Sequence, residues 1–107
     1  MEEPKSIFLK TLGDYPLLRV VDFLMENYIF DYPKTQIAEL SEVSFNTLEV
    51  FWGELIESGM VEKTRKVGKS DMYRINRKNP VVKKLFEIDK ILSEEHCVKT
   101  VSPEIPA

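Results

Sequence analysis

Residues 37–61 read IAELSEVSFNTLEVFWGELIESGMV, and this stretch decides the fold of the chain. Its apolar residues recur at helical spacing on both sides of a short break near Val43. Ser44 is a preferred N-cap residue, and Gly59 fits the left-handed position that ends many helices. The pattern therefore predicts one short helix, a tight turn and a further helix from residue 45 to about residue 58.

A basic hairpin is predicted directly after these helices. Residues 60–67 and 72–76 alternate as two antiparallel strands, joined through the GKSD segment at residues 68–71. A helix pair followed by a basic hairpin is the layout of a winged helix-turn-helix, whose commonest use is binding duplex DNA. We therefore expect an α+β, mostly helical domain with a three-helix core, a β-hairpin wing and a C-terminal helix.

The first helix of this domain is expected to begin at Asp14. Asp14 suits an N-cap and Pro16 suits the first turn, and apolar residues then recur at helical spacing to about Asn27. Residues 31–33 should form a connecting loop, because a residue before proline avoids the helical region. Residues 1–13 precede the helix as a loose arm, whose apolar side chains favour partial docking on the domain or on a second subunit.

The second helix is expected to begin at Lys34 or Thr35 and to end near Ser41. Helical spacing predicts an apolar inner face on this helix and on the third helix, which spans residues 45–58. On these two faces we expect Ile37, Ala38, Leu40, Leu48, Trp52 or Phe51, Leu55 and Ile56.

A fourth helix is predicted from Asn79-Pro80, a cap followed by proline at the first helical position. It should continue to about Glu95, so that the domain covers residues 14–95. Residues 96–107, which contain two prolines, are expected to form a disordered tail.

The overall composition suits one small soluble domain. The chain has 107 residues and 43% hydrophobic content, enough for a single modest core. Its one cysteine, Cys97, cannot form an internal disulfide, which favours a reducing compartment. The start of the chain lacks the pattern of a signal peptide, and no apolar run is long enough to span a bilayer. We therefore expect a cytoplasmic protein without a membrane partner.

Charge is distributed very unevenly along the chain, although the net charge is only −3. Residues 1–62 hold twelve acidic and four basic side chains, whereas residues 63–84 hold nine basic and one acidic. Local potential decides where a polyanion docks. The hairpin segment is therefore the expected binding site of a nucleic acid, provided that the protein's own acids do not neutralise its cations.

The helix-turn-helix phrase resembles that of winged helix-turn-helix transcription regulators of the MarR and ArsR type, especially small archaeal members. The family phrase looks like Ile-Ala-x-Leu-Ser-Gly-Val-Ser-x-x-Thr-Val, and residues 37–48 read IAELSEVSFNTL. Leu55, Gly59 and Val61 follow at matching spacing. The resemblance extends over about residues 14–95 and implies a DNA-binding regulator.

Two departures from the family pattern bear on the target. Glu42 stands where the family usually has glycine, and a left-handed backbone there costs on the order of 1 kcal/mol. The third helix has no lysine or arginine, whereas the family typically has arginine, serine, tyrosine or glutamine at the positions that face the major groove. These positions hold Phe45, Asn46, Glu49, Val50 and Gly53, so phosphate attraction from this helix should be weak.

Three interpretations of the third helix remain open. In the first it reads bases, with Asn46 on an adenine edge, apolar side chains on thymine methyl groups and hydroxyl groups on phosphates. In the second, Phe45, Val50 and Phe51 form an apolar patch for a protein partner. In the third, the aromatic rings fold into the core and the surface is inert. The expected DNA contacts of the first interpretation are Ser44, Phe45, Asn46, Thr47, Glu49 and Val50.

The hairpin and the start of the second helix are expected to supply affinity. Cations that neutralise several phosphates release condensed counterions, and this term dominates binding to duplex DNA. The alternative is a solvated positive hairpin without a function. The expected contacts are Lys63, Arg65, Lys66, Lys69 and Arg74 on the hairpin, with Lys34, Thr35 and Gln36 at the start of the second helix.

The fourth helix carries a candidate dimer interface. Val81, Leu85, Ile88 and Leu92 have the spacing of an a/d seam of about two heptads. An amphipathic helix packed on its own domain would show the same spacing. The resemblance favours a homodimer through terminal helices, which would place two third helices about 34 Å apart on duplex DNA.

Catalysis and metal binding lack support in the sequence. His96-Cys97 supplies two adjacent groups, whereas zinc needs three or four ligands and a nucleophilic cysteine needs an oriented base. We expect no enzyme, no metal and no cofactor. The predicted function is a dimeric transcription regulator that binds double-stranded DNA with some sequence preference. The alternative is a winged-helix adaptor that binds protein and little or no DNA.

Overall fold

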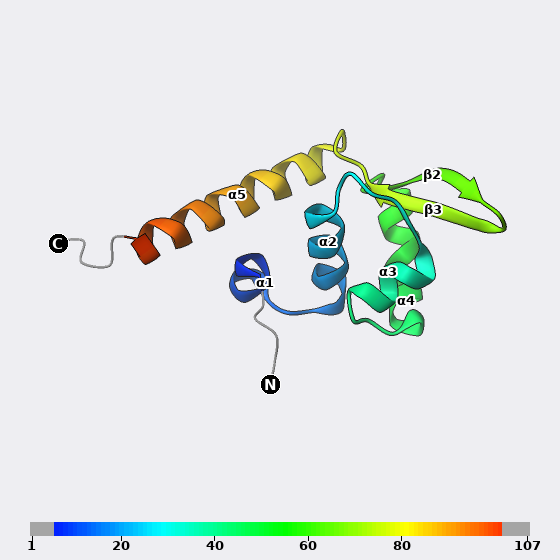
Figure 1. Cartoon of the computed structure of the whole chain (residues 1–107), viewed down its shortest axis with the longest axis horizontal. Coiled ribbons are helices and arrows are strands. Elements are labelled where there is room, and N and C mark those ends of the chain that lie inside the picture. Colours follow the sequence, from blue (N-terminus) through cyan, green and yellow to red (C-terminus); the bar gives the residue numbers. More distant parts are fainter. Residues whose placement is uncertain (1–5, 102–107) are drawn as a thin grey trace.

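The computed structural model describes residues 6–101, and side chains as far as residue 95. Over this part the chain is an α+β fold, mostly helical, with one three-stranded antiparallel sheet (Figure 1), as the α+β prediction required. The elements in chain order are α1 (Ile7–Leu12), α2 (Pro16–Glu26), β1 (Tyr32–Pro33), α3 (Lys34–Leu40), α4 (Phe45–Glu57), β2 (Val61–Val67), β3 (Ser70–Ile75) and α5 (Pro80–Val101).

The core lies where α2, α3 and α4 pack on one another and on the base of the sheet. The predicted inner faces are confirmed for Ile37, Ala38, Leu48, Trp52 and Leu55, which are all buried. The prediction was wrong for Leu40 and Ile56, whose side chains are exposed. Neighbours in a helix point about 100° apart, so the core that covers Leu55 leaves Ile56 outside.

The turn between α3 and α4 depends on a left-handed residue and a serine cap. Glu42 has a φ of 61°, and the next N–H, that of Val43, donates to the Ala38 carbonyl at 2.9 Å. Ser44 Oγ accepts from the Thr47 N–H at 3.1 Å, so the predicted N-cap of α4 is confirmed. Gly59, with a φ of 80°, follows α4 in the left-handed conformation that was predicted.

The sheet has the order β1-β3-β2, with β3 in the centre. β1 lies in the segment that was predicted to be a loop, and Tyr32 pairs with Tyr73 there. The extended conformation that precedes Pro33 suits a short edge strand as well as a loop, which explains the difference.

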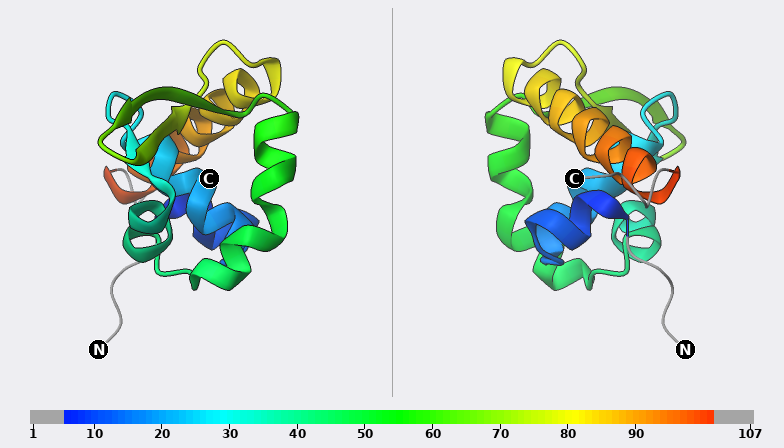
Figure 2. Two further views of the ribbon diagram at one scale, coloured as in Figure 1. Left: turned by 90° about the vertical axis from the view of Figure 1, so that its right-hand side faces the viewer. Right: turned by 90° about the vertical axis from the view of Figure 1, so that its left-hand side faces the viewer.

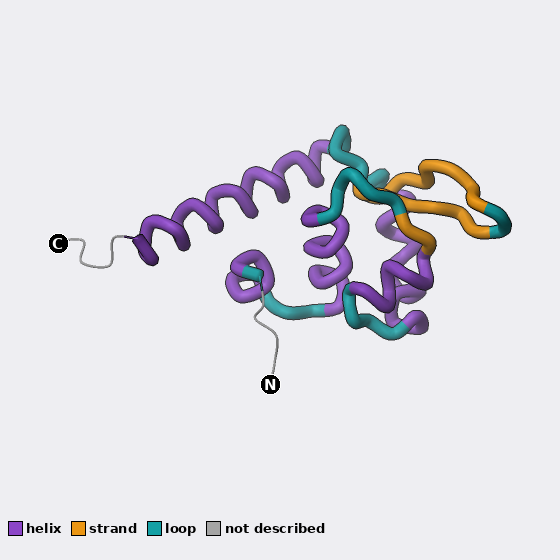
Figure 3. Tube along the Cα trace, in the orientation of Figure 1, coloured by secondary structure: helices purple, strands orange, loops and turns teal. Residues whose placement is uncertain are grey.

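The β2–β3 hairpin projects beyond the helices, as Figure 3 shows in orange. Its turn is two residues long, Gly68-Lys69, and Val67 pairs with Ser70 across it. Gly68 has a φ of 61°, which fits glycine at the first position of a type II′ turn. The register shifts between Lys63 and Arg65, so Thr64 has no pairing partner on β3.

Residues 7–12 form α1, whereas a loose arm was expected there. Ser6 Oγ accepts from the Leu9 N–H at 3.1 Å and caps the helix. Phe8 is fully buried in the core, and α1 packs against α2 and α5. Phe8 and Leu9 of the expected arm therefore pack on the domain itself, whereas Leu12 is exposed.

Asp14 does not cap α2. The N-cap residue is Tyr15, which makes no side-chain cap hydrogen bond, and Pro16 occupies the first turn as predicted. Asp14 instead accepts from Arg19, with Nε at 2.6 Å from Oδ1 and Nη2 at 3.2 Å from Oδ2. A bidentate guanidinium offers the carboxylate a stronger partner than a backbone N–H does.

The Asn79-Pro80 start of α5 is confirmed, because Asn79 Oδ1 accepts from the N–H groups of Val81 and Val82. α5 extends to Val101, so residues 96–101 of the expected tail are helical. Residues 81–102 contain no glycine or proline, so the ordinary signals that end a helix are absent from this stretch. The rest of the expected tail, residues 102–107, lies outside the described residues.

Candidate functional site

The start of α4 presents a polar, exposed surface. Ser44 Oγ donates to Thr47 Oγ1 at 2.8 Å while it accepts from the Thr47 N–H, so these two side chains hold each other. The Thr47 hydroxyl keeps its own proton for an outside acceptor. Asn46 is exposed beside them. The surface can therefore offer a hydroxyl donor and an amide to a ligand.

Lys34 connects the start of α3 to α4. Its Nζ lies 2.7 Å from Glu49 Oε2, and 5.5 Å and 5.8 Å from the centroids of the Phe45 and Trp52 rings. Glu49 is thereby neutralised, and Phe45 is held at the base of α4 with its ring partly exposed. Lys34 is consequently engaged within the protein. Thr35 and Gln36, the other residues expected at this position, are exposed on α3.

The exposed side of α4 is apolar and acidic further along the helix. Val50 is 81% exposed, and Glu54 and Glu57 lie on the surface. Phe51 packs against the core, so it does not belong to an exposed patch with Phe45 and Val50 as one interpretation required.

Two residues of β2 donate hydrogen bonds to the Asp31 carboxylate. Arg65 donates to both of its carboxylate oxygens, from Nε at 2.9 Å and from Nη2 at 3.1 Å, and the Thr64 hydroxyl donates to Oδ2. The hydrogen bond from Arg65, followed by that from Thr64, lowers the pKa of Asp31 to about 2. The register shift in β2 places both donors on the same carboxylate.

The other hairpin cations also meet acids of the protein. Lys63 and Lys66 share Asp71 Oδ1, each at 3.4 Å, and Arg74 Nη2 lies 3.1 Å from Glu62 Oε2. Lys69, at the tip, has no ion pair within the described residues. The condition that the protein's own acids do not neutralise the hairpin cations is therefore not met for Arg65 and Arg74, and Lys63 and Lys66 share a single carboxylate.

The hairpin nevertheless keeps an excess of positive charge. Residues 61–75 contain five basic and two acidic side chains. Within the described residues, only one acid from outside the hairpin, Asp31, forms an ion pair with a hairpin cation. These cations are largely exposed. Exposed ion pairs contribute little to stability and are screened by salt, so a stronger anion can displace the carboxylates.

The seam residues of α5 divide into two groups. Leu85 packs against the core and Leu92 is half-buried, whereas Val81 and Ile88 are exposed. Ile91, which the seam prediction did not include, is 53% exposed on the same side of the helix as Val81 and Ile88. The free apolar strip is therefore made of Val81, Ile88 and Ile91.

One of the acids that pair with the hairpin cations could have been found by counting from its turn. A two-residue turn at Gly68-Lys69 places Asp71 opposite Lys66, whereas Glu62 lies opposite Arg74 only because the register shifts between Lys63 and Arg65. Opposite charges directly across antiparallel strands attract. Asp31 offers no such signal, because it is 34 residues away from Arg65.

Other ligand chemistries find little support in the described region. No group of three or more acidic, histidine or cysteine side chains that could hold a metal occurs among the side chains described, and those of His96 and Cys97 fall outside them. No helix among the described residues is both long and apolar enough to cross a membrane.

No protein-family model matches this sequence, and neither a curated protein nor a solved structure matches it.

Proposed function

We propose that the chain is a winged helix-turn-helix protein, which binds double-stranded DNA as a homodimer and regulates transcription. The observation that carries the proposal is the arrangement of α3, a tight turn, α4 and a projecting basic hairpin. This is the arrangement that winged helix-turn-helix proteins use on duplex DNA. The start of α4, with Ser44 and Asn46 exposed and Thr47 half-buried beside them, is available for contact with a ligand.

The hairpin supplies the affinity in this proposal. Lys69 reaches the phosphates first, because it lies at the tip without an ion pair within the described residues. Lys63 and Lys66 then exchange their shared carboxylate, Asp71, for phosphate oxygens. The gain in free energy comes from counterions released from the DNA. Arg65 keeps its bidentate pair with Asp31 and acts mainly to hold the shape of the hairpin.

The start of α4 supplies a modest sequence preference. Asn46 can form two hydrogen bonds with an adenine edge, and Phe45 can contact a thymine methyl group. The Thr47 hydroxyl donates to a phosphate. Glu49 is an acceptable neighbour for DNA only while Lys34 neutralises it.

The homodimer forms through the apolar strip of α5. Val81, Ile88 and Ile91 are exposed along one side of a helix that extends beyond the other elements (Figure 1). Burial of such residues against a second copy removes apolar surface from water. Sedimentation of the full chain tests this point, because Ile88→Glu should convert dimers to monomers, and a monomeric wild-type chain would contradict it.

A titration of fluorescent 30-base-pair duplexes tests DNA binding. The dissociation constant should rise steeply between 50 and 200 mM salt, by about 40-fold if three phosphates are neutralised and by about 150-fold if four are. A triple variant of Lys63, Lys66 and Lys69 to alanine should flatten this dependence. Undetectable binding at 50 mM salt, or an unchanged slope in the triple variant, would contradict the proposal.

One observation favours a second candidate, a winged-helix adaptor that binds protein. Val50 is 81% exposed in the middle of α4 and is accompanied by Glu54 and Glu57, which repel phosphates. An exposed apolar residue among acids suits a protein surface better than a polyanion. Replacement of Val50 by serine discriminates the two, since an adaptor should lose its partner while a DNA-binding protein should keep most of its affinity for mixed-sequence duplex.

A further inference from the structure

A separate cleft lies where β3 leads into α5. It has a volume of about 350 Å³, and its walls include Tyr28, Ile29, Glu62, Arg74, Arg77 and Lys78. The loop that leads into α5 lies at the upper edge of Figures 1 and 2, whereas α4 begins at the lower edge. A ligand in this cleft would therefore leave the start of α4 uncovered.

One wall of the cleft is unusually apolar for a surface loop. Tyr28 and Ile29 line the cleft and are both exposed, Ile29 to 66%, and Phe30, the next residue of the loop, is 54% exposed but is not among the lining residues. Single exposed apolar residues are common, but adjoining ones beside a cleft mark interaction sites.

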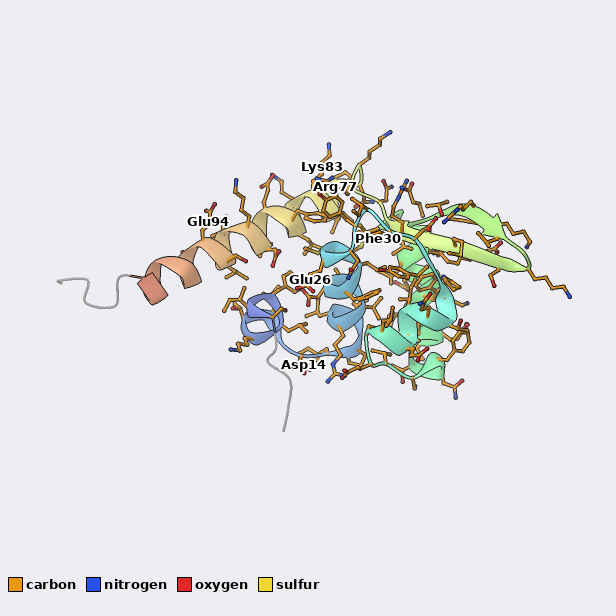
Figure 4. All side chains as sticks on the ribbon, viewed as in Figure 1. Asp14, Glu26, Phe30, Arg77, Lys83 and Glu94 are labelled. Carbon is orange, nitrogen blue, oxygen red and sulfur yellow. The ribbon has the colours of Figure 1, made fainter. Side chains whose placement is uncertain are left out.

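The other wall carries positive charge that the described protein does not neutralise. The Arg77 guanidinium rests on the Tyr28 ring at 4.2 Å and lies 5.4 Å from the Phe86 ring centroid, and these two rings meet edge to face. Neither Arg77 nor Lys78 forms an ion pair within the described residues. Figure 4 shows Arg77 and Lys83 at the same upper edge, with Phe30 on the loop below them.

The aromatic support of Arg77 prepares it for an acidic ligand. A guanidinium stacked on a ring keeps its N–H groups free for a carboxylate, and less side-chain entropy is lost when such a prearranged group binds. Arg74, the third cation of the cleft, is already paired with Glu62. The charge available to a ligand therefore comes from Arg77 and Lys78, directly beside the apolar wall.

We propose that this cleft binds an acidic peptide segment of a partner protein. An aliphatic or aromatic side chain of the segment packs on Tyr28 and Ile29, while neighbouring carboxylates contact Arg77 and Lys78. A nucleic acid would use the two cations but would leave the apolar side chain of Ile29 in water. An acidic and apolar peptide satisfies both walls. This proposal does not depend on DNA binding by α4 and the hairpin.

A random twelve-residue peptide library displayed on phage tests the proposal with the full chain as target. Selected peptides should combine aspartate or glutamate with an adjacent leucine, isoleucine, phenylalanine or tryptophan. The most enriched peptide, synthesised with a fluorescent label, should lose at least tenfold in affinity for the double variant Ile29→Ser, Arg77→Glu. Lys69→Glu, a charge reversal at the hairpin tip, is the matched control and should leave peptide binding unchanged.

Both altered side chains are exposed, so circular dichroism of the double variant should match the wild type, and loss of the contact between Arg77 and the aromatic rings should lower its thermal midpoint by only a few degrees. Selection of no peptide, of peptides without acidic residues, or of peptides that bind the double variant equally well would overturn the proposal. A loss of duplex binding in the double variant, with no effect on peptides, would assign the cleft to nucleic acid instead.

Discussion

Lys34 and Glu49 form an ion pair that ties the start of α3 to the exposed side of α4, with Nζ and Oε2 2.7 Å apart. Lys34 also lies over the Phe45 and Trp52 rings, so one ammonium group contacts an acid and two aromatic rings. The pair offsets the charge of Glu49 on a helix that has no lysine or arginine.

Glu49→Gln should strengthen binding to duplex DNA. The change removes one negative charge from the surface of α4 and releases Lys34 for phosphate contact, so affinity at 50 mM salt should rise by up to about tenfold. Fluorescence anisotropy measures the change. Glu94→Gln, on the far part of α5, removes the same charge away from the site and is the control (Figure 4). Equal effects of the two substitutions would assign the gain to net charge alone.

Lys69→Ala should reduce the salt dependence of DNA binding. Loss of one phosphate contact lowers the slope of log K against log salt by about 1 and weakens binding to all duplex sequences alike. Lys90→Ala, an exposed lysine on α5, is the matched control and should leave the slope unchanged. If both variants shift the slope equally, the tip of the hairpin has no special contact with DNA.

Asp22→Asn should stabilise the protein at neutral pH. Asp22 is buried on α2, and burial, together with the charges of Glu26 and Asp89, raises its pKa to about 6, against the opposing effect of a hydrogen bond from Ser6. The protonated carboxyl is therefore favoured in the folded state. Its contribution to stability is fully present below about pH 4 and is lost as pH rises through about 6.

Urea unfolding at pH 4, 6 and 7.5 measures this effect. Asparagine mimics the neutral acid, so the gain for the variant should reach about 1–3 kcal/mol at pH 7.5 and should vanish toward pH 4. Glu26→Gln, on the exposed side of the same helix, should give a much smaller gain. A variant less stable than the wild type at pH 7.5 would show that the ionised Asp22 is held by a partner.

Glu42→Gly should stabilise the turn between α3 and α4. A residue with a side chain at a φ of 61° is strained, and glycine removes that strain. Glycine also increases the conformational entropy of the unfolded chain, but this loss of stability is smaller than the gain from the relieved strain. The free energy of unfolding should rise by about 0.5–1 kcal/mol. Glu42→Gln keeps the backbone strain and changes only the charge, so its thermal midpoint of unfolding should stay close to that of the wild type.

Most features that depend on neighbours in the chain were predicted well, although the cap expected at Asp14 was wrong. Ser44, Gly59 and Asn79 act as the caps and stops that their types and spacing indicated. The bounds of α3 and α4 also lie within one or two residues of the prediction. Each of these features is decided by hydrogen bonds across three or four residues, which helical periodicity and cap preferences represent directly.

Features that join distant segments were missed or incomplete. α1 looked like an arm because its six residues form a helix only when Phe8 has a core to enter. β1 is two residues long and exists only because β3 offers an edge. The charge excess of the hairpin was visible in the composition, but the position of Asp31 beside Arg65 was not.

The sequence by itself determined the helix pair, its caps and the basic hairpin, because these follow from short-range hydrogen bonding and apolar periodicity. Only the tertiary structure decided which cations remain without acidic partners and where the cleft lined by Tyr28 and Arg77 lies. Ion pairs and clefts depend on distant segments that packing of the core brings together, and local sequence patterns do not predict such contacts.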